Sequence, residues 1–216
     1  MREIIMISQQ VQHLLSWLTN HHQPGTRLLI AVVGPPGAGK STLSEELVDR
    51  INEIQGEGHA AVVPMDGFHL TNEVLIERGR LDRKGAPDTF DVEGLIHLVE
   101  RIKHADADVR YPIFDRSIEA SHIDAGLLPI ECEVVVVEGN YLLLNEAPWS
   151  ELAPNFDLTV FTSPSFDELE RRLIQRWLDH GYTQQQAEQK AWNNDLLNAK
   201  TVIDRSLKAD LIFNQD

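Results

Sequence analysis

The sequence predicts an α/β fold of three layers, in which a mostly parallel sheet is covered by helices on both faces. Short apolar runs rich in Val and Ile alternate along the chain with segments of helical periodicity. Each apolar run has the length and composition of a strand that is buried on both faces. The alternation predicts right-handed crossovers between parallel strands. Because no repeat or linker divides the chain, we expect one domain over residues 1–216.

The expected elements follow one another from the first residues to the last. Val11, Leu14 and Leu18 have helical spacing and predict an amphipathic first helix, which Pro24 and Gly25 end. Later helices are indicated by apolar residues at helical spacing between 95 and 102 and between 169 and 177. The expected strands are the apolar runs 28–33, 60–64, 134–137, 157–162 and 209–213.

Composition narrows the class of protein. Nineteen Lys and Arg against 34 Asp and Glu give a net charge of -15, which disfavours binding to nucleic acid or to anionic membranes. Cys132 is the single cysteine, so neither an internal disulfide nor a thiolate zinc site is expected, and the histidines, including His21 and His22, show no zinc-ligand spacing. Since no apolar run is long enough to cross a bilayer, we expect a cytoplasmic protein.

Residues 34–41, GPPGAGKS, carry the strongest functional signal, because they match the phosphate-binding pattern G-x-x-x-x-G-K-[ST]. The motif follows the first expected strand and precedes a helical segment, as in a P-loop NTPase fold. The alternative, a Gly-rich turn that only joins a strand to a helix, does not account for the match at every fixed position of the motif. Glycines let backbone N–H groups point at phosphates, Lys40 would reach the β and γ phosphates, and Ser41 would bind Mg²⁺. ATP and Mg²⁺ are the expected cofactors. The expected nucleotide-binding residues are Gly34, Pro35, Pro36, Gly37, Ala38, Gly39, Lys40, Ser41 and Thr42.

Two acids follow expected strands. Asp66 comes just after the run 60–64, and Glu138 directly follows four valines. The carboxyl ends of parallel strands meet at one edge of the sheet, so both acids are expected beside the phosphate loop. We expect Glu138 to contribute to the Mg²⁺ site and to border the substrate, with capping of the next turn as the alternative. Asp66 could take the proton of the phosphoryl acceptor, or could be a simple Asp-Gly turn residue.

Basic residues form two further groups. Arg171, Arg172 and Arg176 lie on an expected helix, with the last two one turn apart, and could close over the phosphates. The alternative is a solvated helix face on which they pair with neighbouring acids. The segment 77–91 is rich in Arg, Lys, Gly and Asp and predicts a surface loop. The candidate contacts to the acceptor are Arg83 and Lys84 in this loop, Arg116 after Phe114-Asp115, and His69 near Asp66.

Four segments together resemble the uridine kinase, pantothenate kinase and phosphoribulokinase group. They are the phosphate loop and the segments 65–69 (MDGFH), 83–91 (RKGAPDTFD) and 137–142 (VEGNYL). The likeness runs from about residue 28 to the C-terminus and looks closest to bacterial pantothenate kinase, although this chain is shorter.

The resemblance implies a P-loop kinase with a five-stranded parallel core and a helical lid over about residues 165–195. It implies that Asp66 is the general base, that Lys40, Arg172 and Arg176 are catalytic, that Arg171 contacts the nucleotide, and that Arg116 contacts the acceptor. The implied reaction is ATP-dependent transfer of the γ-phosphoryl group to a hydroxyl of a metabolite. Since segment 66–69 differs from the Asp-Ser-Phe-Tyr of uridine kinases, the acceptor stays open among a nucleoside, a pantothenate-like alcohol and a sugar.

The expected partner is therefore a small molecule with a hydroxyl group, and a homodimer is a further option. The rival hypothesis is a regulatory nucleotide-binding NTPase or switch without such an acceptor. The sequence lacks the Asn-Lys-x-Asp motif that reads guanine, which weakens the GTPase form of this hypothesis.

Overall fold

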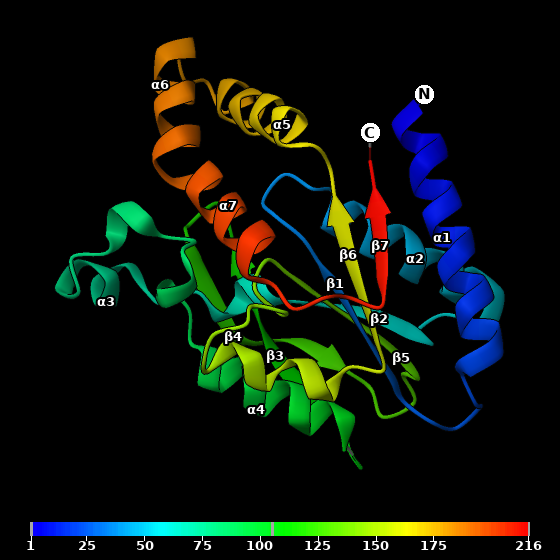
Figure 1. The fold of residues 1–216 in the computed structure, drawn as a ribbon. Helices are drawn as coiled ribbons and strands as arrows, with labels where there is room; N and C mark the ends of the chain where they lie inside the picture. Colours follow the sequence, from blue (N-terminus) through cyan, green and yellow to red (C-terminus); the bar gives the residue numbers. More distant parts are fainter. Residues whose placement is uncertain (1, 105, 216) are drawn as a thin grey trace.

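A five-stranded parallel sheet forms the centre of the protein (Figure 1). The computed structural model describes residues 2–104 and 106–215. All neighbouring strands in this sheet run parallel, in the order β2-β5-β1-β6-β7. The sheet confirms the predicted fold class and each of the five expected runs. The strands are β1 (Leu28–Val33), β2 (Ala60–Pro64), β5 (Val134–Gly139), β6 (Leu158–Ser163) and β7 (Leu211–Asn214).

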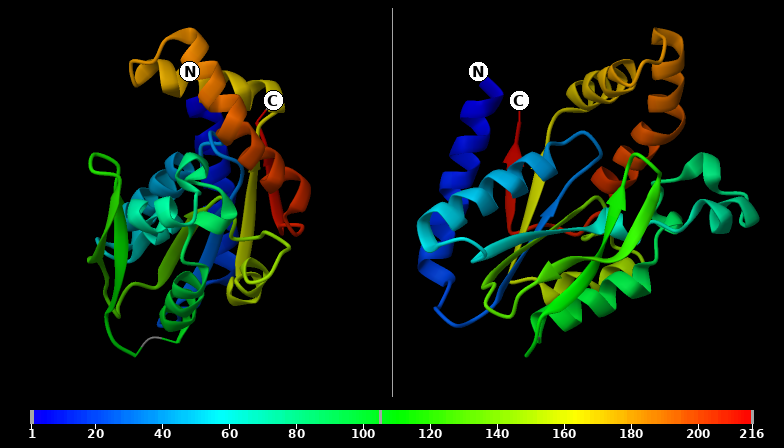
Figure 2. Two further views of the ribbon diagram at one scale, coloured as in Figure 1. Left: turned by 90° about the vertical axis from the view of Figure 1, so that its left-hand side faces the viewer. Right: turned by 180° about the vertical axis from the view of Figure 1, so that it is seen from behind.

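Helices cover both faces of the sheet and make the three expected layers (Figures 1 and 2). One face packs against α1 and α2, and the other packs mainly against α4. The helices are α1 (Arg2–His21), α2 (Lys40–Gln55), α3 (Asn72–Glu77), α4 (Val92–Lys103), α5 (Phe166–Asp179), α6 (Gln184–Lys190) and α7 (Leu196–Arg205), with a π-helical turn, η6 (Ala191–Asp195), between the last two.

Strand β1 shows why the apolar runs are continuous rather than alternating. Leu28 and Ile30 belong to the apolar cluster with α1 and α2, whereas Leu29 and Ala31 belong to the cluster with α4. Successive side chains of a strand point to opposite faces, so a strand covered on both sides needs an apolar residue at every position. All six residues of β1 are buried.

A two-stranded antiparallel hairpin, β3 (Val109–Asp115) and β4 (Ala120–Leu128), stands apart from the central sheet and was not predicted. The hairpin buries few side chains, and Ile123 is 84% exposed, so its sequence lacks the apolar runs that identified the other strands. Tyr111 Oη donates a hydrogen bond to the Val62 carbonyl at 3.2 Å and ties the hairpin to β2. This packing carries the turn with Arg116 to the carboxyl edge of the sheet.

The prediction that all of segment 77–91 is a surface loop is wrong for its second half. Its first part is exposed, but Ala86, Thr89 and Phe90 are buried. Thr89 Oγ1 donates to the Ala86 carbonyl at 2.7 Å, and Tyr141 Oη donates to the Gly85 carbonyl at 2.7 Å. The second half of this segment therefore packs against the core and is held there by hydrogen bonds.

Helices α5 and α6 stand beyond the carboxyl edge of the sheet (Figure 1). Helix α5 begins after Ser165, whose side chain accepts a hydrogen bond from the Glu168 amide, and α6 begins with a capping box between Thr183 and Gln186. Over the described parts of the chain, none of the helices combines the length and the apolar character needed to span a bilayer.

Candidate active site

The carboxyl ends of β1, β2 and β5 meet at one edge of the sheet and open into a cleft of about 960 Å³. In the strand order, the chain passes from β1 to β2 on one side of the sheet and from β6 to β7 on the other side. Ligands of α/β folds bind where the connections diverge in this way. The predicted site residues that line the cleft are Pro36, Gly37, Gly39, Lys40, Ser41, Thr42, Asp66, His69, Arg83, Lys84, Arg116, Glu138 and Arg176.

The phosphate loop connects β1 to the amino end of α2. Gly39 has φ 78°, a left-handed conformation that favours glycine, and precedes the first residue of the helix. A Cβ atom on Gly34 would lie 2.4 Å from Thr162 Oγ1, so the start of the loop also needs glycine. Gly34, Pro35 and Ala38 shape this loop without lining the cleft. The amino end of the helix gives the cleft free N–H groups and a positive dipole, which suit an anion.

Lys40 is buried beside two acids. Its Nζ donates a hydrogen bond to the Pro35 carbonyl at 3.0 Å, within its own loop. Burial lowers the pKa of Lys40, and the charges of Glu138 and Asp66 oppose that shift. The ammonium group therefore lies where a phosphate can replace the loop carbonyl as its partner.

Glu138 and Ser41 provide the oxygen atoms of a candidate Mg²⁺ site. Glu138 is 9% exposed, and it faces Pro64 of β2 and Val32 of β1 in the strand register. Burial raises the pKa of Glu138, while the charge of Lys40 and a hydrogen bond from Ser41 act in the opposite direction. Carboxylate and hydroxyl oxygens fit the preference of Mg²⁺ for hard ligands, so these two residues could hold the ion.

Asp66 lies in a short 3-10 helix, η1 (Met65–Phe68), directly after β2. Its Oδ2 accepts a hydrogen bond from Arg116 Nη2 at 2.8 Å, and their side chains are 29% and 75% exposed. A Cβ atom on Gly67 would lie 2.1 Å from the Pro112 carbonyl oxygen, so glycine lets the hairpin pack against η1. The Asp-Gly-Phe segment is therefore more than a turn, because it joins Asp66 to the hairpin that carries Arg116.

His69 lies between two aromatic rings on the same side of the cleft. Its ring centroid is 4.2 Å from that of Phe90 and 4.7 Å from that of Phe114. Its Nδ1 lies 2.9 Å from the Asp66 carbonyl oxygen. Burial lowers the pKa of His69, which favours a neutral ring near pH 7. The ring therefore supports the Asp66 backbone and borders the cleft.

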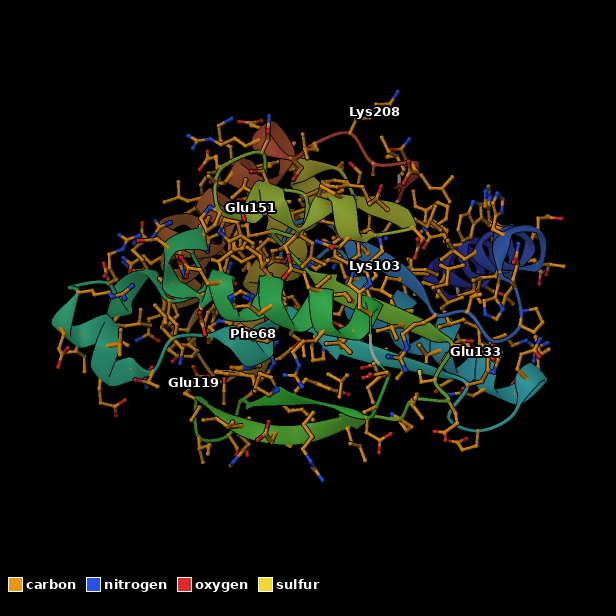
Figure 3. All side chains as sticks on the ribbon, turned by 90° about the horizontal axis from the view of Figure 1, so that it is seen from below. Phe68, Lys103, Glu119, Glu133, Glu151 and Lys208 are labelled. Atoms are coloured by element: carbon orange, nitrogen blue, oxygen red, sulfur yellow. The ribbon has the colours of Figure 1, made fainter. Side chains whose placement is uncertain are left out.

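Arg83 and Lys84 line the cleft, but both hold protein partners. Arg83 donates to the Asn193 carbonyl at 3.0 Å and to Asn198 Oδ1 at 3.1 Å. Lys84 Nζ donates to Asn72 Oδ1 at 2.8 Å and to the Glu119 carbonyl at 2.9 Å. Glu119 lies in the turn between β3 and β4 and is labelled in Figure 3. These bonds join the segment 77–91 to the helical region on one side and to the hairpin on the other.

The three arginines of α5 occupy different positions. Arg176 lines the cleft and pairs with Asp195 of η6 at 2.9 Å. Arg172 Nη1 donates to the Gly37 carbonyl at 3.3 Å, against the phosphate loop. Arg171 has a 65% exposed side chain, pairs with Glu168 and is not among the residues that line the cleft. The pairing with neighbouring acids that was the alternative explanation does occur, since Arg172 also donates to Glu168.

Several cleft residues were not identified from the sequence. They include polar side chains around η6 and two aromatic rings at the end of the helical region. Helical spacing placed Trp177 on an expected helix without relating it to the site, and no sequence pattern predicts a π-helical turn. Asn140 could have been found, because it lies in the 137–142 motif. The additional residues include Asn72, Asn140, Trp177, Tyr182, Gln186, Gln189, Asn193, Asn194 and Asn198.

Comparison with known proteins decides the family. The model of the phosphoribulokinase / uridine kinase family matches residues 29–215. The chain belongs to this family. A solved structure named "putative fructose transport system kinase", from Silicibacter sp. TM1040, is 43% identical, covers 95% of this chain and 98% of its own, and has a TM-score of 0.86. The "Putative uridine kinase C227.14" of Schizosaccharomyces pombe is 32% identical, over 92% of this chain and 86% of its own.

Pantothenate kinases of the same group are more distant and longer. The pantothenate kinase of Lacticaseibacillus casei is 29% identical over 79% of this chain but only 56% of its own length. This comparison confirms the recognised group and the shorter length of the present chain. As a member of the phosphoribulokinase / uridine kinase family, the protein is a P-loop kinase that transfers a phosphoryl group to an alcohol.

Proposed function

We propose that the protein is a cytoplasmic, Mg²⁺-dependent ATP kinase that phosphorylates a hydroxyl group of a small, polar metabolite. The observation that carries this proposal is the convergence of Lys40, Asp66 and Glu138 in one cleft next to the phosphate loop. This set contains a phosphate ligand, a proton acceptor and a metal ligand. A regulatory NTPase needs the first and the third, but it has no need of an acid aimed at a second substrate.

The roles of the residues follow from their chemistry. The loop amides and Lys40 bind the β and γ phosphates, and the nearby Arg172 and Arg176 neutralise further charge. Ser41 and Glu138 would hold Mg²⁺, which would supply positive charge against the negative charge of the phosphates. In the transfer, a bond forms between the acceptor oxygen and the γ phosphorus, the bond to the β-phosphate oxygen breaks, and the acceptor proton passes to Asp66.

The acceptor side of the cleft indicates a polar substrate. Asp66, Arg116, His69, Lys84 and Asn72 line the cleft there, and Phe90 and Phe114 add apolar surface. Several donors and acceptors spaced around one pocket fit a compound with several hydroxyl groups. We propose a sugar or a nucleoside as the first candidates, with a pantothenate-like alcohol next. The named relatives support this order, because the 43% identical structure is named for fructose transport.

Acceptor-dependent ATP consumption tests the proposal. Purified protein is incubated with Mg-ATP and each member of a panel of hexoses, pentoses, nucleosides and pantothenate, while ADP and inorganic phosphate are measured separately. We expect one class of acceptor to raise ADP release without any rise in inorganic phosphate. Release of ADP and inorganic phosphate in equal amounts, unchanged by every compound, would support the regulatory NTPase instead.

Glu138→Gln is expected to raise the Mg²⁺ concentration needed for half-maximal activity about tenfold or more, because the amide removes the negative ligand but keeps the shape. The measurement is a Mg²⁺ titration of the rate at saturating ATP. Glu146→Gln is the matched control, since Glu146 pairs with Arg205 at an exposed position outside the cleft lining. An unchanged Mg²⁺ requirement in Glu138→Gln would remove Glu138 from the metal site.

Arg176→Ala is expected to lower kcat by about 10³-fold, as for other arginines that neutralise the transferred phosphoryl group. We propose that residues 165–195 act as a lid that brings this guanidinium to the phosphates. Arg171→Ala is the matched control on the same helix, because Arg171 lies outside the cleft lining. The two variants are compared by steady-state kinetics. Equal losses of kcat would show that α5 matters only as a whole.

A further inference from the structure

A second cluster of ligand-type side chains lies at the opposite end of the sheet from the cleft. His22 directly follows α1, His59 precedes β2, and Glu133 precedes β5. Since these strands are parallel, both residues lie at amino ends, whereas the phosphate loop, Asp66 and Glu138 lie at carboxyl ends. Figure 3 shows Glu133 and Glu119 on opposite sides of the molecule. The cluster is therefore separate from the candidate active site.

The three side chains converge on one point. His22 Nε2 lies 3.1 Å from Glu133 Oε2, and His59 Nε2 lies 3.7 Å from the same oxygen. One ligand atom from each residue lies within 4.8 Å of the others. Bonds of about 2.1 Å to a tetrahedral Zn²⁺ place neighbouring ligand atoms roughly 3.4 Å apart. The two separations from Glu133 Oε2 bracket this value and the third is within 4.8 Å, so side-chain rotation could bring the three atoms to three corners of a tetrahedron.

Backbone contacts hold the cluster in place without a metal. The amides of Glu133 and Val134 donate to the His59 carbonyl at 3.0 and 3.1 Å, which fixes the two ligand-bearing segments side by side. Glu133 Oε1 accepts a hydrogen bond from the Gly25 amide at 2.9 Å, which leaves Oε2 directed at the histidines. Such secondary contacts orient the ligands of known metal sites. The ligand side chains are only 16% to 23% exposed.

We propose that His22, His59 and Glu133 bind a divalent transition-metal ion of the zinc class, with the fourth position open to water. Two imidazoles and one carboxylate are a ligand set that suits Zn²⁺. His22 Nε2 also lies 3.1 Å from the Thr26 carbonyl, a contact that metal binding would replace. Spacing in the sequence does not indicate this cluster, because its members come from three distant segments.

A metal ion bound at this site would link the end of α1 to the sheet. The family model begins at residue 29, so α1 and His22 lie outside the matched region. Leu14 and Leu18 of α1 pack on the sheet, and a metal bound by His22 would add a fixed link at the end of the helix. We therefore expect metal binding to stabilise the docking of α1 and the fold as a whole, independently of the kinase reaction.

Binding is tested on untagged, full-length protein treated with a chelator and then titrated with ZnCl₂ in a calorimeter. We expect one Zn²⁺ per chain and an increase in Tm of about 5 °C when free zinc is 100 times Kd. CoCl₂ serves as an optical probe, because a tetrahedral site gives an intense visible absorption band.

His59→Ala and Glu133→Gln should each weaken zinc binding about 100-fold or more and abolish the cobalt band. His21→Ala is the matched control, because His21 adjoins His22 but stacks on Trp17 outside the cluster. Circular dichroism checks that each variant folds. The proposal is overturned if wild-type protein takes up no zinc, or if His59→Ala and His21→Ala bind it equally well.

Discussion

Asp66→Asn is expected to lower kcat by about 10²–10⁴-fold while leaving the affinity for Mg-ATP nearly unchanged. The asparagine keeps the shape of the side chain but cannot accept the proton of the attacking hydroxyl. Nucleotide affinity is expected to be retained because the loop amides and Lys40, rather than Asp66, bind the phosphates in the proposed arrangement. The partner that loses its charge pair, Arg116, is 75% exposed, so the cost to folding is small.

Single-turnover kinetics and nucleotide calorimetry on the same preparation measure both expectations. Asp49→Asn is the matched control, because Asp49 is an exposed acid on α2 that does not line the cleft. A similar kcat in wild type and Asp66→Asn would exclude Asp66 as the general base. Loss of nucleotide binding in parallel with kcat would instead assign Asp66 to the nucleotide site.

Lys40→Ala is expected to weaken Mg-ATP binding by about 100-fold or more and to remove measurable turnover. Its ammonium group is a buried positive charge that can reach the phosphates, and alanine leaves the negative charge near Glu138 uncompensated. Removing Lys40 also costs folding stability, because the buried carboxylate of Glu138 loses the positive charge that opposes its desolvation. We therefore expect a decrease in Tm beside the larger losses of nucleotide affinity and turnover.

Calorimetry with a non-hydrolysable ATP analogue, together with thermal unfolding, separates these effects. Lys208→Ala is the matched control, since Lys208 is exposed and outside the cleft lining, and it lies at the outer edge of the molecule in Figure 3. Wild-type affinity in Lys40→Ala would mean that the nucleotide binds without the phosphate loop.

The parallel sheet could be predicted because each of its strands can be recognised from consecutive residues of the sequence. A strand buried on both faces needs a continuous apolar run, and the four valines before Glu138 provide one. The parallel arrangement then puts the ends of β1, β2 and β5 together, which is why Lys40, Asp66 and Glu138 could be placed in one cleft from sequence alone.

The remaining features depend on contacts between distant segments. The hairpin β3-β4 exposes much of its surface, so the pattern that identifies buried strands is absent. Its turn carries Arg116, whose pairing with Asp66 follows from hairpin packing over Gly67. The asparagines around η6 line the cleft, and the π-helical turn in this segment departs from the regular helical spacing on which sequence reasoning depends.

The arginines of α5 were likewise predicted only in part from the local sequence. Periodicity placed Arg172 and Arg176 on one side of a helix, but spacing alone did not separate a phosphate contact from a pair with a neighbouring acid. The structure places Arg176 in the cleft and Arg171 outside its lining. Helical spacing places Arg171 on a different face from Arg176, but the contact of Arg172 with the phosphate loop and the position of Arg176 in the cleft depend on packing between distant segments.

The fate of the γ-phosphoryl group tests the central claim most directly. ³¹P NMR of a reaction with Mg-ATP and the acceptor found in the panel follows this group through turnover. The account predicts that the γ-phosphate resonance is replaced by a phosphate monoester resonance in equal amount, with ADP as the other product. Conversion to inorganic phosphate alone, at the same rate with and without the acceptor, would contradict it.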